Sequence, residues 1–190
     1  MIKIAFYGKS GSGKSTIAQV AKKFFEKQNL SIEVIKFAEP LYRLQSEFYK
    51  TAGVEVGYYD QDQTLMEDIA KHLRIIDPKS LVKDFNSRLI KSTADVVIND
   101  DVRDTKDDFP YLKEQEFVLI RIYCEEEVRI KRLEQRNDIN IVKESDTTKD
   151  IDKIQYDFLV DTTSENFEET KELVINYLEK IVKDEKEECK

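Results

Sequence analysis

The chain has 190 residues, of which 40% are hydrophobic and 37% are charged, and its formal net charge is −8. This length fits one α/β domain and excludes a second domain of ordinary size. The negative charge disfavours nucleic acid as a partner, because counterion release from a polyanion rewards a basic surface.

Strands and helices alternate along the first half of the chain. A β-rich run ends at a glycine-rich turn, and apolar residues at spacings of three and four predict a helix after it. Asp77-Pro78 combines a capping residue with a proline suited to the first helical position. In chain order, the expected elements are a strand at 2–7, a helix through residue 25, a strand at 32–37, and helices at 40–50, 64–73 and 78–92.

The same alternation continues in the second half. Short β-rich runs are separated by charged helical segments, and residues 137–152 are polar and poor in core residues. The expected elements are strands at 96–98, 117–123 and 158–160, and helices at 125–136 and 165–183. This pattern predicts a five-stranded, mainly parallel sheet with helices on both sides, a three-layer α/β/α fold.

A glycine-rich segment lies between the first strand and the first helix. Gly8-Lys9-Ser10-Gly11-Ser12-Gly13-Lys14-Ser15-Thr16 matches the phosphate-loop pattern G-x-x-x-x-G-K-[ST]. Glycines let backbone N–H groups converge on phosphate oxygens, and the positive end of the next helix adds attraction. The residues expected to bind ATP are Ser10, Gly11, Ser12, Gly13, Lys14, Ser15 and Thr16.

Lys14 and Ser15 have distinct expected roles. Lys14 is expected to reach the β- and γ-phosphate oxygens, and the Ser15 hydroxyl is expected to hold Mg²⁺. The predicted fold is therefore of the P-loop NTPase type, with ATP and Mg²⁺ as cofactors. No Asn-Lys-x-Asp element follows the fourth strand, which argues against a GTPase.

Three arginines of the predicted helix at 125–136 share one face. Arg129, Arg132 and Arg136 are spaced by three and four residues and precede the polar segment. We expect them to belong to a lid over the phosphates, because arginine forks neutralise the charge of a transferring phosphoryl group. A solvated face paired with nearby glutamates is the alternative.

Acidic residues and an arginine follow the third predicted strand. Ligands of parallel sheets bind beyond the carboxyl ends of the strands, next to the phosphate loop. We expect Asp101 to hold Mg²⁺ directly or through water, and Arg103 to grip an acceptor phosphate. A polar turn that caps a buried strand is the alternative.

The expected location is the cytoplasm. No apolar run approaches membrane-spanning length, and residues 1–7 have the pattern of a strand instead of a signal peptide. Cys124 and Cys189 are interpreted as free thiols of a reducing compartment. The expected partner is a small-molecule nucleotide, with no membrane, and a homodimer is left open.

Four segments together resemble virus-encoded deoxynucleoside monophosphate kinases. They are Gly8–Thr16, Phe37-Ala38-Glu39-Pro40-Leu41, Ile75-Ile76-Asp77-Pro78 and Asp101-Val102-Arg103. That family carries similar F-A-D-P-L, R-x-I-D-P and D-V-R segments, and the resemblance covers most of residues 1–136. Weaker similarity extends to animal-type phosphomevalonate kinases, which share the D-V-R and the arginine spacing at Arg121, Arg129 and Arg132, and to dephospho-coenzyme A kinases.

The resemblance implies ATP-dependent phosphorylation of a (deoxy)nucleoside 5′-monophosphate by a single kinase domain. It implies a helical acceptor-binding insertion at about 39–93 and a lid at about 125–152. The implied catalytic residues are Lys14, Arg103 and Arg132. The implied substrate-binding residues are Glu39, Arg43, Arg74, Arg88, Asp101 and Arg103.

The sequence departs from that family within the acceptor-binding insertion. The family's R-x-L-L-Q-x-L-G segment is here residues 63–70, with Glu67 in place of Gln and Ala70 in place of Gly, and Leu81 stands where the family has Trp. The identity of the accepted base therefore stays open.

Two alternatives to a monophosphate acceptor also remain. One is a hydroxyl acceptor, as in dephospho-coenzyme A kinases or nucleoside kinases, with Glu39 or Asp101 as the base. The other is a nucleotide-binding regulatory module that hydrolyses slowly.

Overall fold

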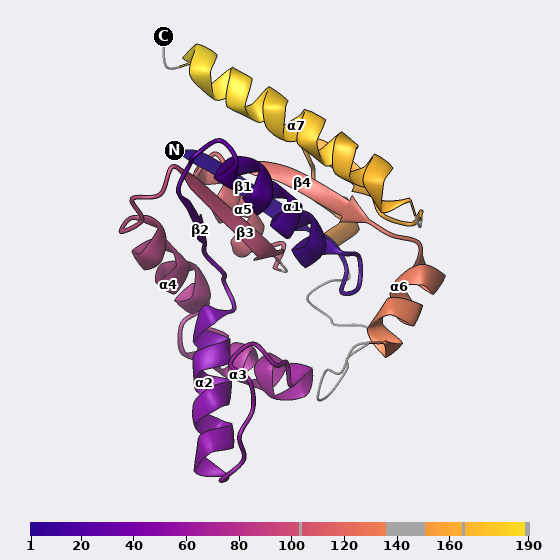
Figure 1. Ribbon diagram of the computed structural model, residues 1–190. Helices are drawn as coiled ribbons and strands as arrows, with labels where there is room; N and C mark the ends of the chain where they lie inside the picture. Colours follow the sequence, from indigo (N-terminus) through magenta and orange to yellow (C-terminus); the bar gives the residue numbers. More distant parts are fainter. Residues whose placement is uncertain (103, 136–150, 165, 189–190) are drawn as a thin grey trace.

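The computed structural model describes residues 1–102, 104–135, 151–164 and 166–188, which form a parallel sheet between two layers of helices (Figure 1). The strands are β1 (Ile2–Tyr7), β2 (Ile32–Val34), β3 (Val96–Val102), β4 (Val118–Tyr123) and β5 (Phe158–Asp161). Their order in the sheet is β2-β3-β1-β4-β5, and every pair is parallel. The predicted three-layer fold with a five-stranded sheet is confirmed.

The helices agree with the expected pattern at most positions. They are α1 (Lys14–Glu26), α2 (Glu39–Thr51), α3 (Gln63–Ile76), α4 (Ser80–Leu89), α5 (Asp108–Glu114), α6 (Glu126–Glu134) and α7 (Phe167–Glu188), with a 3₁₀ turn η2 (Ile151–Lys153). Among these, α5 was not expected from the sequence, because seven residues with a proline show little helical periodicity.

Two strands differ in length from the prediction. β2 stops at Val34 because the chain turns away after Ile35 and directs the next backbone amides toward Asp101 of β3. β3 continues past Ile98 to Val102, since its polar residues are buried there, and Asn99 donates to the Ile35 carbonyl and to Asp101.

The helix predicted to start at Pro78 begins two residues later, at Ser80. Asp77 ends α3, and its backbone N–H donates to the Leu73 carbonyl at 2.9 Å. α4 begins only at Ser80, after a turn in which Asp77 Oδ1 accepts from the Lys79 N–H. The capping residue therefore stabilises the turn between the two helices instead of the first turn of α4.

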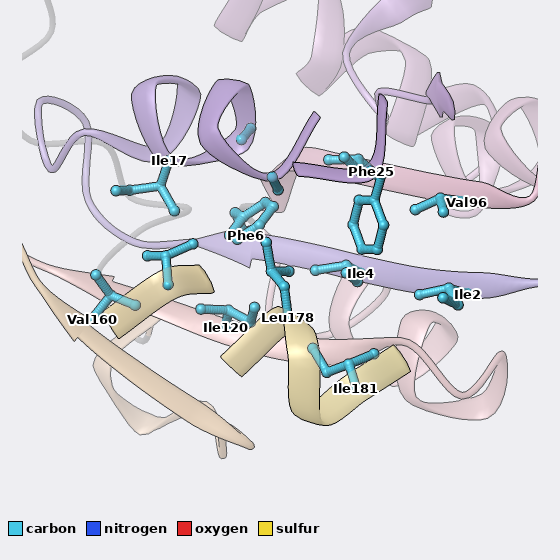
Figure 2. Packing of buried hydrophobic residues seen from close by; sticks show 14 of the residues in the cluster. Ile2, Ile4, Phe6, Ile17, Phe25, Val96, Ile120, Val160, Leu178 and Ile181 are labelled. Carbon is cyan, nitrogen blue, oxygen red and sulfur yellow. The ribbon is translucent and has the colours of Figure 1, made fainter. Parts of the chain in front are cut away.

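One face of the sheet packs against α1 and α7. Alternate residues of β1 point toward these helices, and Figure 2 shows Phe6 between α1 and Leu178 of α7. Phe6, Phe25 and Leu178 have no exposed surface. Complete burial of such side chains stabilises the fold by about 1.5–3 kcal/mol each.

The opposite face is covered by α4, α5 and η2. Phe37 stacks on Phe85 of α4, with their ring centroids 4.1 Å apart. Tyr7 is buried here and donates to the Ile154 carbonyl at 3.0 Å, just after η2. Burial raises the pKa of the Tyr7 hydroxyl above its ordinary value.

A third, smaller core lies away from the sheet. α2 and α3 project from one end of the molecule in Figure 1 and pack on each other and on Leu81 of α4. Their connecting loop is held by Gln45, whose side chain bonds the backbone of both Asp60 and Asp62. Among the described residues, no helix combines the length and apolar character needed to cross a membrane.

Candidate active site

The phosphate loop leaves the carboxyl end of the central strand. β1 lies between β3 and β4, and the loop begins at Gly8, one residue after β1 ends. Neighbouring strands and helices therefore surround the loop. This is the edge of a parallel sheet at which ligands of α/β proteins bind.

Two glycines are required by how closely the loop approaches its neighbours. A Cβ at Gly8 would lie 2.2 Å from the Ile122 carbonyl oxygen of β4. A Cβ at Gly11 would lie 2.8 Å from the Arg129 carbonyl oxygen and 2.9 Å from Leu133 Cγ of α6. Both glycines have positive φ, 153° and 82°, which side chains rarely adopt. The curled backbone thus depends on these two residues.

The N-terminus of α1 is suited to an anion. Its N-cap is Gly13, which provides no side chain to accept from the helical amides, and its first turn has no acidic residue. Lys14 Nζ donates to the carbonyls of Gly8 at 2.8 Å and Lys9 at 3.0 Å, so its ammonium group lies across the loop. Ser15 and Thr16 are exposed in the same turn. The structure therefore brings the predicted ATP-binding residues together.

Two arginines predicted to be lid residues make contacts at or beside the loop. Arg129 is buried, and its Nη1 donates to the Ser10 carbonyl at 2.9 Å while its other nitrogens pair with Glu126. Arg132 donates to the Thr162 carbonyl at 2.8 Å. The contacts of both arginines thus connect α6 to its surroundings, and a catalytic role for Arg132 stays a prediction. Arg136 lies outside the described residues.

Thr162 contacts the phosphate loop, which the sequence patterns did not predict. It follows β5, and its hydroxyl lies 2.8 Å from the Ser12 carbonyl and 3.0 Å from the Tyr123 carbonyl. Its backbone carbonyl meanwhile accepts from Arg132. The only available signal was its place just after the last strand, where side chains of parallel sheets face the ligand edge.

Asp101 holds the junction between β2 and α2. One carboxylate oxygen accepts from the Phe37 N–H at 2.9 Å and from Asn99 Nδ2 at 2.7 Å, and the other accepts from the Ala38 N–H at 2.8 Å. A carboxylate has about four acceptor positions, so this geometry leaves room for a contact through water. Binding of Mg²⁺ by the exposed Ser15 hydroxyl and by Asp101, directly or through water, stays a prediction.

The end of β3 carries further buried charge. Asp100 pairs with Lys36, and although burial acts to lower the pKa of Lys36, the carboxylates of Asp101 and Asp100 raise it overall. Asp108 is buried at the start of α5, where burial raises the pKa of its carboxyl to about 7. The predicted residue Arg103 lies outside the described residues.

Arg74 and Arg88 occupy different surroundings. Arg74 Nε lies 3.5 Å from Asp104 Oδ2, close to the end of β3, and a substrate contact by Arg74 stays a prediction. Arg88 donates to Asp84 at 2.7 Å and to the Lys36 carbonyl at 2.6 Å, which fixes α4 to the end of β2. A substrate contact by Arg88 stays a prediction.

Glu39 and Arg43 lie beside an aromatic cluster that was not predicted. Tyr58 donates to Glu39 Oε1 at 2.6 Å, and its ring centroid is 4.9 Å from that of Tyr59 and 6.3 Å from that of Tyr42. Tyr58 and Tyr59 are exposed, at 41% and 59%. Burial and the Glu39 hydrogen bond raise the pKa of Tyr58 to about 12, and Arg43 acts in the opposite direction. These residues form a polar and aromatic surface at the first turns of α2.

Comparisons with known proteins agree with this fold. A family model described as an AAA domain matches residues 4–152. The gluconokinase from Sinorhizobium meliloti 1021 superposes with a TM-score of 0.52 at 14% sequence identity, covering 100% of this chain and 98% of that one. The shikimate kinase from Acinetobacter baumannii, solved with shikimate, also gives 0.52 at 14% identity, covering 97% and 95%. No curated protein matches the sequence.

Proposed function

This chain belongs to the AAA domain family, and from that premise we propose that it transfers the γ-phosphoryl group of ATP to a (deoxy)nucleoside 5′-monophosphate. The observation that carries the proposal is the phosphate loop at the end of the central strand, with the Lys14 ammonium across it. A loop of this geometry supports binding of a triphosphate tail.

The proposed mechanism relies on positioning and charge neutralisation. The acceptor phosphate is already anionic, so it attacks the γ-phosphorus without a strong general base. Lys14 and the amides of the α1 N-terminus bind the phosphate oxygens, on which negative charge is concentrated. Ser15 and Asp101 would hold Mg²⁺, which would supply further charge neutralisation. Roles for Arg103 and Arg132 in binding the acceptor and the transferring group are part of this proposal.

The acceptor is proposed to bind between the sheet edge and the α2–α3 pair. Exposed aromatic rings suit the flat face of a nucleobase, because ring stacking does not require a specific donor pattern. Tyr58 and Tyr59 supply such rings, and Arg43 and Arg74 supply positive charge. We assign residues 39–93 to acceptor binding within a single domain, and part of the proposed lid at 125–152 lies outside the described residues.

A hydroxyl acceptor is the second candidate. Glu39 at the start of α2 could accept a proton from a hydroxyl, which a phosphate acceptor does not need. The superposed structures also include kinases named for gluconate and shikimate, both hydroxyl compounds. The aromatic surface favours the nucleotide, since a polyol offers no flat ring to stack.

A coupled ADP-release assay with a panel of acceptors tests the proposal. The panel contains ribo- and deoxynucleoside monophosphates, dephospho-coenzyme A, phosphomevalonate, gluconate and shikimate. We expect release to depend on one or more monophosphates. Acceptor-dependent release with hydroxyl compounds alone would support the second candidate, and ATP binding without release for any acceptor would favour a regulatory module.

Replacement of Lys14 tests the proposed mechanism at a single residue. Lys14→Ala removes the cation that faces the phosphates, so kcat should fall by about 10³-fold or more while the fold persists. The measurement is ADP release, with circular dichroism as the check of folding. Lys23→Ala, at an exposed position of the same helix, should retain activity. Full turnover by Lys14→Ala would contradict the mechanism.

A further inference from the structure

A small cavity beside the phosphate loop contains two cations that no other assignment uses. Lys9 of the loop and Arg121 of β4 both line it, and its volume is about 180 Å³. Sites for drug-sized ligands are typically about 300–1,000 Å³, so this cavity suits one ionic group and not a whole nucleotide.

One carboxylate joins the two cations. Asp152 Oδ1 accepts from Arg121 Nη2 at 2.6 Å, and Asp152 Oδ2 lies 3.4 Å from Lys9 Nζ. The two oxygens of one anion are therefore divided between two positive groups from different elements. A phosphate oxygen pair can make the same contacts, because carboxylate and phosphate present similar acceptor geometry to arginine.

A buried hydroxyl lies in the same cavity. Ser12 is only 1% exposed, and its Oγ has no hydrogen-bond partner among the residues that the structure describes. A buried hydroxyl without a partner is costly, and a ligand oxygen would satisfy it. Glu126 also lines the cavity, but its carboxylate pairs with Arg129, and this hydrogen bond lowers the pKa of Glu126.

From these contacts we propose that Lys9, Arg121 and Ser12 form a second phosphate-binding position, and that Asp152 is an internal counter-ion which a substrate phosphate displaces. The inference rests on the proposed function for its ligand class. The phosphate comes either from ATP or from the acceptor. In both cases Asp152 competes with the substrate, so its charge weakens substrate binding.

Calorimetric titration with inorganic pyrophosphate tests the competition without any turnover. Asp152→Asn should bind pyrophosphate about tenfold more tightly than the wild type, since the competing charge is gone. The double variant Asp152→Asn with Arg121→Met should lose this gain in pyrophosphate affinity. Glu127→Gln is the control for a general change in charge, because Glu127 is exposed in the first turn of α6. Asp152→Ser should reproduce the gain if its cause is the lost charge.

Steady-state kinetics then identify the source of the phosphate. A lower KM for ATP alone in Asp152→Asn assigns the position to the donor, and a lower KM for the acceptor alone assigns it to the acceptor. Unchanged or weaker pyrophosphate binding by Asp152→Asn, or a gain that survives Arg121→Met, would overturn the inference. The titration decides even if no acceptor is found, so failure of the proposed function is separable from failure of this inference.

Discussion

Single hydrogen bonds decide how the phosphate loop is held. Thr162 contacts Ser12 of the loop and Tyr123 of β4, and Arg129 contacts Ser10. These contacts are to backbone carbonyls, which leaves the loop amides free of these side chains. The loop is therefore held through its backbone carbonyls, while its backbone amides stay available for an anion.

Gly11 is a residue at which added volume should harm the loop through its contact with α6. Gly11→Ala places a methyl group 2.8 Å from the Arg129 carbonyl oxygen at φ 82°, so it combines strain with a clash. We expect unfolding free energy to fall by about 2 kcal/mol or more. Gly53→Ala is the matched control, since Gly53 has φ 73° with open space around it. Equal losses for the two variants in urea unfolding would argue against the close approach to α6.

The buried carboxyl of Asp108 should make stability depend on pH. Its folded pKa of about 7 lies above the ordinary value of 3.8, so the folded state holds the proton more tightly than the unfolded state. The resulting stabilisation is complete below about pH 4 and is lost as pH rises to about 7. At roughly 1.4 kcal/mol per pKa unit, the total approaches about 4 kcal/mol.

Urea unfolding at pH 5 and pH 8 checks this dependence. Asp108→Asn mimics the protonated side chain and keeps an acceptor for the Asp104 N–H. This variant should therefore remove most of the fall in stability between pH 5 and pH 8. The wild type should therefore lose more stability than Asp108→Asn between the two pH values. Parallel losses in both chains would show that other groups cause the dependence.

Among the elements, the junction of β2 and α2 depends most on one distant side chain. Asp101→Asn replaces one acceptor oxygen by an NH₂ group that faces a backbone N–H of Phe37 or Ala38. The unsatisfied donors should lower unfolding free energy by about 1–3 kcal/mol. Unfolding measured beside kcat separates this role from metal binding. Unchanged stability with a large loss of kcat would instead identify Asp101 as a metal-binding residue only.

The predictable part of the site is local in sequence. The loop from Gly8 to Thr16 follows from residue types and their spacing, and the strand and helix pattern predicted the layers of the fold. The bracing contacts could not be predicted in the same way, because they join residues far apart in the chain. Asp101 and Phe37 are 64 positions apart, and Thr162 and Ser12 are 150 apart.

The prediction of element boundaries was wrong where tertiary contacts outweighed the local conformational preference of the residues. The Asp77-Pro78 pair has the composition of a helix start, yet Asp77 closes α3 and binds the Lys79 amide. The arginine face of α6 was predicted from its spacing, but Arg129 is buried against Ser10 and Glu126. Spacing identifies a shared face without indicating what that face contacts.

At the scale of the whole molecule, α7 closes the core on one side of the sheet. Leu178→Ala removes a fully buried side chain beside β1 and should cost about 2–5 kcal/mol of unfolding free energy. Leu173→Ala, at a position 37% exposed on the same helix, should cost less. The KM for ATP should stay unchanged in both, because Glu185 of α7 pairs with the chain N-terminus, at the opposite end of β1 from the loop. A thermal melt that ranks the two variants in the opposite order would contradict this packing.

The separate core of α2 and α3 has a consequence for how this molecule can diverge. Its side chains pack mainly with one another, apart from the two faces of the sheet. Substitutions there can reshape the proposed acceptor surface while β1 and its phosphate loop keep their surroundings. Under the proposed function, the preference for an acceptor can therefore change while the phosphate loop stays the same.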